Sequence, residues 1–141
     1  LYIAGDGEEK KILKKMIVDR QVQNNVFLLG YCENVFPLIK NSSVVISTSL
    51  WEDPGAAMIE SAYCNKLVIS SNCRNGPEEF LKYGECGYLF RNNDATDLQN
   101  KINDFLNENE NSKFKKAVIS KKNSKMYSLF RHYQKLNKIL V

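Results

Sequence analysis

The chain has 141 residues, of which 43% are hydrophobic and 26% charged, a composition that excludes a disordered chain, a collagen and a small disulfide-held protein. No run approaches the roughly 18 consecutive apolar residues of a membrane span, so we expect a cytoplasmic protein. The net charge of +4 is unevenly placed. Residues 1–112 hold 11 Lys/Arg and all 16 Asp/Glu, whereas residues 113–141 hold nine Lys/Arg and no acid.

Strands and helices are predicted to alternate along the first part of the chain. In chain order we expect a strand over 1–5, a glycine turn over 5–7, an amphipathic helix around 12–17, a strand over 26–29, a short helix around 35–39 and a strand over 44–47. The first strand starts without an initiator Met, and we expect that a further segment precedes it.

The second part of the chain continues the alternation. We expect a helix from about Gly55 to Cys64, a strand over 67–70, a turn over 75–77, a short helix with Phe80 and Leu81, a strand over 87–90 and helices after Asp94. Short Val/Ile/Leu-rich strands without polar alternation are typical of a parallel sheet covered on both faces. The fold class is therefore α/β, with a Rossmann-like parallel sheet, helices on both faces and a helical C-terminal tail.

Parallel α/β sheets bind ligands at the loops that follow the carboxyl ends of their strands. One such loop ends in Asp53-Pro54-Gly55. We expect Asp53 to cap the next helix, Pro54 to occupy its first position and Gly55 to let a ligand approach the backbone. Free N–H groups at a helix start favour phosphate or sugar oxygens, although an ordinary capped helix gives the same pattern.

Glu60 lies further along the same predicted helix. Its neighbours on one helix face are small: Ala56, Ala57 and Cys64. The core side is expected to carry Met58, Ile59, Ala62 and Tyr63. A carboxylate among small residues leaves room for a ligand and can accept two hydrogen bonds from a ribose diol. A solvated glutamate would show the same spacing.

Glu52 and Glu60 are separated by seven residues in Ser49-Leu50-Trp51-Glu52-Asp53-Pro54-Gly55-Ala56-Ala57-Met58-Ile59-Glu60-Ser61-Ala62. This segment resembles the donor-site motif of the retaining glycosyltransferases of family 4, also called group 1. The resemblance extends from Leu1 to about Leu106. It implies the GT-B fold, in which two Rossmann-like halves face each other across a cleft, and it identifies the chain as the C-terminal, donor-binding half.

The resemblance also implies roles for individual residues. Glu60 would bind the ribose hydroxyls of a nucleotide-sugar, UDP- or GDP-linked, and Glu52, the implied catalytic residue, would contact the donor sugar near the reacting carbon. The amides around Gly55 and Ala56 would hold sugar hydroxyls or the diphosphate.

Two further glycines, Gly5 and Gly7, would border the diphosphate side of the cleft. Asp53-Pro54 replaces the Gly-aromatic pair common in the family, a departure that resembles members building bacterial surface polysaccharides.

Parts of the implied enzyme would precede Leu1. They are a strand and loop with an Arg and a Lys for the diphosphate, and the acceptor-binding half. We expect residues 1–110 to form a nucleotide-sugar-binding domain without its first strand, and residues 111–141 a basic amphipathic helical segment. The isolated chain is expected to bind donor weakly and to transfer no sugar.

The C-terminal segment carries an apolar stripe at helical spacing. The stripe comprises Met126, Leu129, Phe130, Tyr133, Leu136 and Leu140, with Lys125, Arg131, Lys135 and Lys138 around it. It indicates either attachment to an anionic surface at the inner face of the plasma membrane or packing on the acceptor-binding half, which we favour. Nucleic acid is not an expected partner, because no recognition motif accompanies the basic residues.

Other candidate sites are weaker. Arg74 lies in a loop at a predicted strand end and could approach a phosphate. Cysteines and the histidine show no metal-ligand spacing. Two adjacent carboxylate pairs, Glu52-Asp53 and Glu78-Glu79, are interpreted as residues of helix starts, so no metal and no cofactor is expected.

These observations predict the donor-binding domain of a retaining glycosyltransferase that moves a hexose from a nucleotide-sugar to a glycan or lipid-linked acceptor in cell-envelope polysaccharide or lipopolysaccharide synthesis. The alternative is a non-catalytic Rossmann-like binding or assembly module. A sugar-nucleotide epimerase would need acid and base residues that cannot be placed in this sequence.

Overall fold

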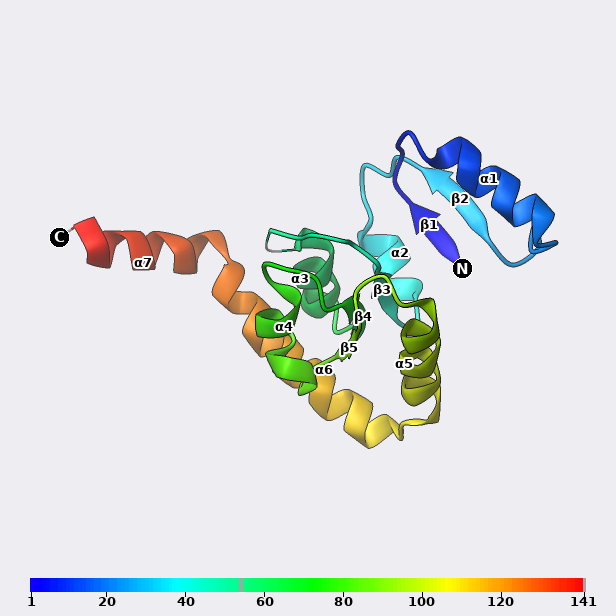
Figure 1. The fold of residues 1–141 in the computed structure, drawn as a ribbon. Coiled ribbons are helices and arrows are strands. Elements are labelled where there is room, and N and C mark those ends of the chain that lie inside the picture. The colour runs from blue at the N-terminus through cyan, green and yellow to red at the C-terminus, as the bar shows by residue number, and fades with distance from the viewer. Residues whose placement is uncertain (54, 141) are drawn as a thin grey trace. The chain divides into compact units, whose positions relative to one another are not determined.

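The computed structural model describes residues 1–53 and 55–140 and contains two compact units, which divide after Pro37. Every strand pair is parallel (Figure 1). The predicted α/β class with parallel sheets and flanking helices is confirmed.

The first unit contains one βαβ motif. Strand β1 (Tyr2–Ala4) leads through a glycine turn into helix α1 (Lys10–Asp19), and strand β2 (Phe27–Gly30) returns beside β1. The two strands are in register from Tyr2 opposite Phe27, whose rings stack with centroids 5.1 Å apart. A parallel pair joined by a crossover helix is the smallest element of this fold class. Helix α2 (Phe36–Asn41) contains the point where the chain passes into the second unit.

The second unit is built on a three-stranded parallel sheet in the order β3-β4-β5. The strands are β3 (Val45–Ser47), β4 (Val68–Ser71) and β5 (Tyr88–Phe90). The helices between them are α3 (Ala56–Tyr63) and α4 (Pro77–Phe80), the latter followed by the single turn η1 (Lys82–Gly84). All four residues of the central strand β4 are buried, as expected for a strand covered on both faces.

Each face of this sheet has its own hydrophobic cluster. On one face Val68 packs with Met58 and Ala62 of α3, with Phe80 of α4 and with Leu81, which follows α4. On the other face Leu67 and Ile69 pack with Tyr88 and Phe90 of β5 and with Phe105 of helix α5 (Ala95–Asn107). Neighbouring residues of a strand point to opposite faces, so the run Leu67-Val68-Ile69 supplies both clusters.

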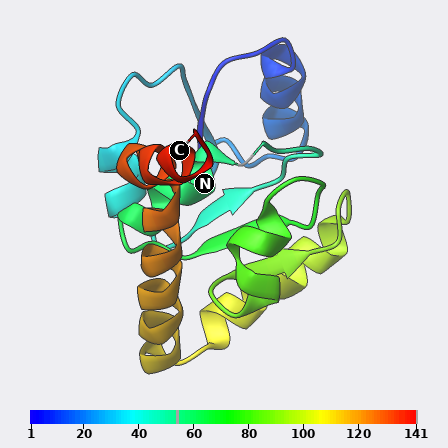
Figure 2. The same cartoon turned by 90° about the vertical axis from the view of Figure 1, so that its left-hand side faces the viewer.

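Helix α6 (Glu110–Ser124) runs along the second unit and packs against α3 and α4 (Figures 1 and 2). Its buried residues include Ser120 and Ser124, which are small enough to allow a close approach. The Asn123 side-chain amide also donates to the Phe80 carbonyl. The predicted boundary at residue 110 falls at the start of this helix, and the division into two domains stays a prediction.

A short turn, η2 (Lys125–Tyr127), joins α6 to the last helix, α7 (Leu129–Leu140). The break occurs at Ser128, whose ψ of 149° is extended rather than helical. The apolar stripe on α7 is exposed, with Leu129 86% accessible. Within the described ranges, no helix combines the length and apolarity needed to cross a membrane.

Candidate functional site

The loop after β3 is fixed by residues at the carboxyl ends of β4 and β5. The Ser71 hydroxyl donates to the Ser49 carbonyl, and the Asn92 amide donates to the Leu50 carbonyl at 3.3 Å. The Glu52 amide donates to the Arg74 carbonyl, also at 3.3 Å. The sequence Ser49 to Glu52 is therefore held at the carboxyl edge of the sheet, where ligands of α/β folds bind.

Glu52 is half-buried in this loop. Its Oε1 atom accepts a hydrogen bond from the Ser49 hydroxyl at 2.7 Å and a longer one from the Ser47 hydroxyl at 3.3 Å. Neither serine was identified from the sequence. The signal was present, because Ser-x-x-Glu is a spacing that can bring a hydroxyl and a carboxylate together, and here it does so in a loop.

The N-cap of helix α3 is Gly55, whose φ of 90° and ψ of 72° are left-handed. The prediction that Asp53 caps this helix is wrong, because no side chain caps α3 and its N-cap is two residues later. The predicted placement of Pro54 lies outside the described residues. A glycine fits here because other residues are strained at positive φ. The amides of Ala56 and Ala57 precede the first hydrogen bonds of the helix, which Met58 and Ile59 donate to the Gly55 carbonyl.

Glu60 is half-buried on α3. Ala56 and Ala57, two of its predicted small neighbours, are exposed, and Cys64 is half-buried. The opposite side buries Met58, Ser61 and Ala62. Tyr63 was expected on the core side and is instead 39% accessible, because Ser61 occupies the buried position, donating its hydroxyl to the Ala57 carbonyl at 2.6 Å. Glu60 thus has the small residues Ala56, Ala57 and Cys64 beside it, together with the exposed Tyr63 one turn further along the helix.

The structure brings Glu52 and Gly55 together. A Cβ atom added to Gly55 would lie 3.6 Å from Glu52 Oε2 and would overlap the terminal methyl of Met58. The carboxylate therefore reaches the backbone at the helix start. This part of the site combines an acid, a left-handed glycine and free helix amides, groups that can hold hydroxyls and anionic oxygens.

Gly5 and Gly7 lie in the first unit, in the turn between β1 and α1. Gly5 has a φ of 135°, and its amide donates to the Gly30 carbonyl at 2.8 Å. A Cβ atom at Gly5 or Gly7 would meet no atom within 4 Å. Between them, Asp6 pairs with Lys10 at 2.8 Å, and the hydrogen bonds from Lys10 and the Gly7 amide lower the pKa of Asp6. The turn is open to a ligand, and the role implied for the two glycines stays a prediction.

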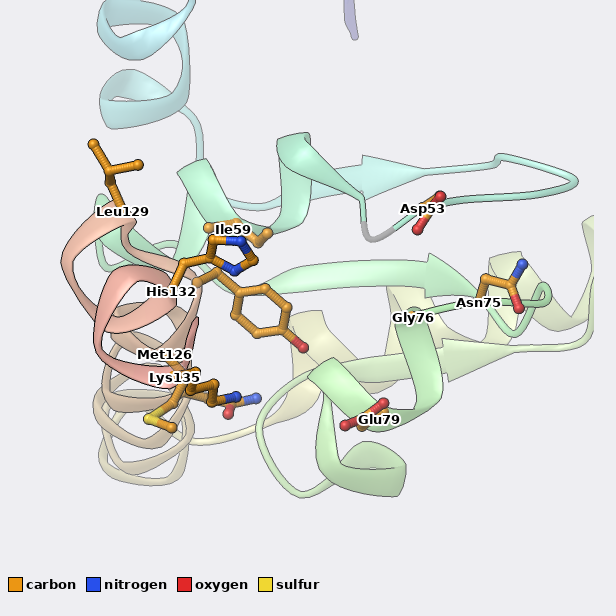
Figure 3. A pocket seen from close by; sticks show the side chains of 11 residues that line it. Asp53, Ile59, Asn75, Gly76, Glu79, Met126, Leu129, His132 and Lys135 are labelled. Atoms are coloured by element: carbon orange, nitrogen blue, oxygen red, sulfur yellow. The ribbon is translucent and has the colours of Figure 1, made fainter. Parts of the chain in front are cut away.

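A groove of about 980 Å³ opens beside the start of α3 (Figure 3). One wall carries Asp53, Asn75, Gly76 and Glu79 from the sheet loops and α4, and the other carries Met126, Leu129, His132 and Lys135 from η2 and α7. Glu52 and Glu60 are not among the lining residues, whereas their neighbours Asp53 and Ile59 are. The groove adjoins the predicted donor site without containing its two acids.

Arg74 is exposed, and its predicted approach to a phosphate stays a prediction. Over residues 1–53 and 55–140, no three His, Cys, Asp or Glu side chains gather closely enough to hold a metal ion.

The order of these elements can be compared with known protein families. A family model described as glycosyl transferases group 1 matches residues 1–125. The chain belongs to this family. The family assignment made from the resemblance of residues 49–62 and of the chain from Leu1 to about Leu106 is confirmed.

Related group 1 glycosyltransferases act in cell-envelope synthesis. The poly(ribitol-phosphate) alpha-N-acetylglucosaminyltransferase of Staphylococcus aureus is 33% identical over 125 residues, which are 85% of this chain and 25% of that protein. The lipopolysaccharide core biosynthesis glycosyltransferase LpsE of Rhizobium meliloti is 28% identical over 109 residues, 77% of this chain and 32% of that one. The chain spans about a quarter to a third of the length of these two relatives.

Solved structures confirm the expected GT-B glycosyltransferase fold. A mutant of S. aureus TarM in complex with Fondaparinux, alpha-GlcNAc-glycerol and UDP is 29% identical and superposes with a TM-score of 0.86 over 97% of this chain and 28% of that one. Anabaena HepE in complex with UDP, 23% identical, shares the fold with a TM-score of 0.87 over 99% of this chain and 40% of that one.

Proposed function

We propose that this group 1 chain is the donor-binding half of a retaining glycosyltransferase. The enzyme would move a hexose from a UDP- or GDP-sugar to a glycan or lipid-linked acceptor of the cell envelope. Support comes from family membership, from relatives named for cell-wall and lipopolysaccharide glycans, and from the UDP complexes of TarM and HepE.

The observation that carries the proposal is the half-buried carboxylate of Glu52 beside the left-handed Gly55 at the start of α3. In the proposed complex, the amides from Gly55 and Ala56 hold sugar hydroxyls or the diphosphate. Glu60, on the face with small neighbours, accepts hydrogen bonds from the ribose diol. Glu52 faces the donor sugar near the reacting carbon, where a negative charge stabilises the positive charge that develops as the bond to phosphate breaks.

The role of α7 is part of the same proposal. Its exposed stripe packs on the acceptor-binding half, since an amphipathic helix normally buries its apolar side against protein. Attachment to an anionic membrane is the alternative that the basic residues of this segment allow.

Transfer by the full-length polypeptide tests the proposal. Purified protein is incubated with UDP- and GDP-hexoses and with candidate polyol-phosphate and lipid-linked acceptors, with and without EDTA. We expect transfer with one donor, an unchanged anomeric configuration by NMR, no effect of EDTA, and a loss of kcat of at least about a hundredfold in Glu52→Gln.

Glu85→Gln is the matched control, because Glu85 is exposed and lies outside the proposed site. Inversion of the anomeric carbon would contradict the retaining mechanism. Binding of nucleoside diphosphate without transfer to any acceptor would favour the non-catalytic module.

A further inference from the structure

The orientation of the Glu52 carboxylate is set by two serine hydroxyls. An ionised carboxylate only accepts hydrogen bonds, so Ser49 at 2.7 Å and Ser47 at 3.3 Å both act as donors, and both reach the same oxygen, Oε1. The two hydroxyls are themselves 3.3 Å apart. Oε1 is therefore occupied from the protein side.

The two serines are attached to rigid parts of the fold. Ser47 is the last residue of β3 and is buried. Ser49 follows two residues later, and its carbonyl accepts a hydrogen bond from Ser71, the last residue of the adjacent strand β4. The hydroxyls are thus held by two paired strands rather than by a free loop. Their hydrogen bonds in turn fix the position of the Glu52 carboxylate.

The second oxygen of Glu52, Oε2, is placed differently. It accepts no hydrogen bond from the residues that the structure describes, and it lies 3.6 Å from the point where a Gly55 side chain would begin. The missing side chain of Gly55 therefore leaves this oxygen open at the start of α3. One oxygen of the carboxylate is bound by protein and the other is left for a ligand.

We propose that Ser49, supported by Ser47, is a positioning residue that holds Glu52 with Oε2 toward the donor sugar; this inference rests on the proposed function of Glu52. Hydrogen bonds to a charged group are stronger than neutral ones, and a small misplacement of a catalytic group can cost a large factor in rate. Ser49 touches no substrate and acts only through the carboxylate.

Ser49→Ala in the full-length polypeptide is the test, with Ser49→Thr as the variant that keeps the hydroxyl. We expect Ser49→Ala to lower kcat about tenfold, since one charge-assisted hydrogen bond is lost. The Kd for free UDP or GDP should change less than about twofold, because Glu52 faces the sugar. Ser49→Thr should recover most of the rate. Ser43→Ala, an exposed serine outside the site, is the control and should behave as wild type.

A double-mutant cycle separates positioning from folding. In a Glu52→Gln background, Ser49→Ala should cost no further activity, because the group that it orients has already been changed. An unchanged kcat in Ser49→Ala, or equal additive losses in both backgrounds, would overturn the proposal. If wild type binds and transfers no nucleotide-sugar, the proposed function itself fails, and the positioning role of Ser49 fails with it; a fully active Ser49→Ala refutes the positioning role alone.

Discussion

Lys116 Nζ lies 2.9 Å from Glu108 Oε2, and this ion pair joins α6 to the end of α5. The Ser112 hydroxyl and the Tyr88 hydroxyl also donate to the Glu108 carboxylate, and Lys116 lies over the Tyr88 ring at 4.3 Å. Burial alone would raise the pKa of Glu108, but the hydrogen bonds from Lys116, Ser112 and Tyr88 outweigh it and lower that pKa to about 2. The charged form of Glu108 therefore stabilises the packing of β5, α5 and α6.

Glu108→Gln should lower the free energy of unfolding by the part that depends on the ionised Glu108 carboxylate. Because the folded pKa is below the unfolded value, the stabilisation is complete above about pH 4.5 and is lost as the pH falls toward about 2. We expect the variant to lose about 1–3 kcal/mol of unfolding free energy at neutral pH. Urea unfolding at pH 7 and pH 3 measures this, and the difference from wild type should shrink at pH 3.

Glu110→Gln is the matched control for Glu108→Gln. Glu110 also pairs with a lysine, Lys113, at 2.9 Å, but its side chain is 88% accessible, and exposed pairs contribute about 0–1 kcal/mol. If both variants lost the same stability, or if the loss in Glu108→Gln did not change with pH, the network around Glu108 would not have the assigned role.

Gly55→Ala should destabilise the second unit and weaken donor binding. An L-residue in the left-handed region costs about 1–2 kcal/mol, and the new methyl group would also displace the Met58 side chain and crowd Glu52. We expect a loss of about 1–3 kcal/mol in chemical denaturation. Gly84→Ala is the control, because φ there is 97° but the surrounding space is open. A Gly55→Ala protein as stable as wild type would show that the start of α3 is not constrained.

The α7 stripe should be covered in the full-length polypeptide. We expect no flotation with vesicles rich in anionic lipid at low or high salt, and a lower Tm when the exposed Phe130 is replaced by Glu. Lys138→Glu is the control. It also introduces a glutamate into α7, but at a basic residue beside the stripe, and it should leave Tm nearly unchanged. Flotation at low salt that disappears at high salt would instead show that the segment binds membranes electrostatically.

Much of the fold follows from local patterns in the sequence. The apolar runs at 67–70 and 87–90 predicted β4 and β5 because their residues lack polar alternation. All of β4 is buried, and in β5 Tyr88 and Phe90 are buried and Leu89 is half-buried. The spacing of Glu52 and Glu60 located the loop and helix of the candidate site. Such features are local, and propensity and periodicity are enough to identify them.

Other features depend on contacts between distant segments. The helix start near Gly55 was predicted, but its N-cap is Gly55 and not Asp53. The preceding loop is hydrogen-bonded to Ser71, Arg74 and Asn92, which are distant in sequence. The network at Glu108 joins residues 20 positions apart. Residues so far apart in the sequence come into contact only when the chain folds, so these pairs could not be predicted from spacing.

The central claim is that the start of α3 binds a nucleotide-sugar with Glu60 on the ribose. Calorimetric titration of UDP, GDP and their hexose derivatives into the full-length polypeptide tests it most directly, with Glu60→Ala compared with Glu85→Ala. The account predicts saturable binding of one nucleotide, at least about tenfold weaker in Glu60→Ala and unchanged in Glu85→Ala. An affinity that does not depend on Glu60, or no binding of any nucleotide by wild type, would contradict it.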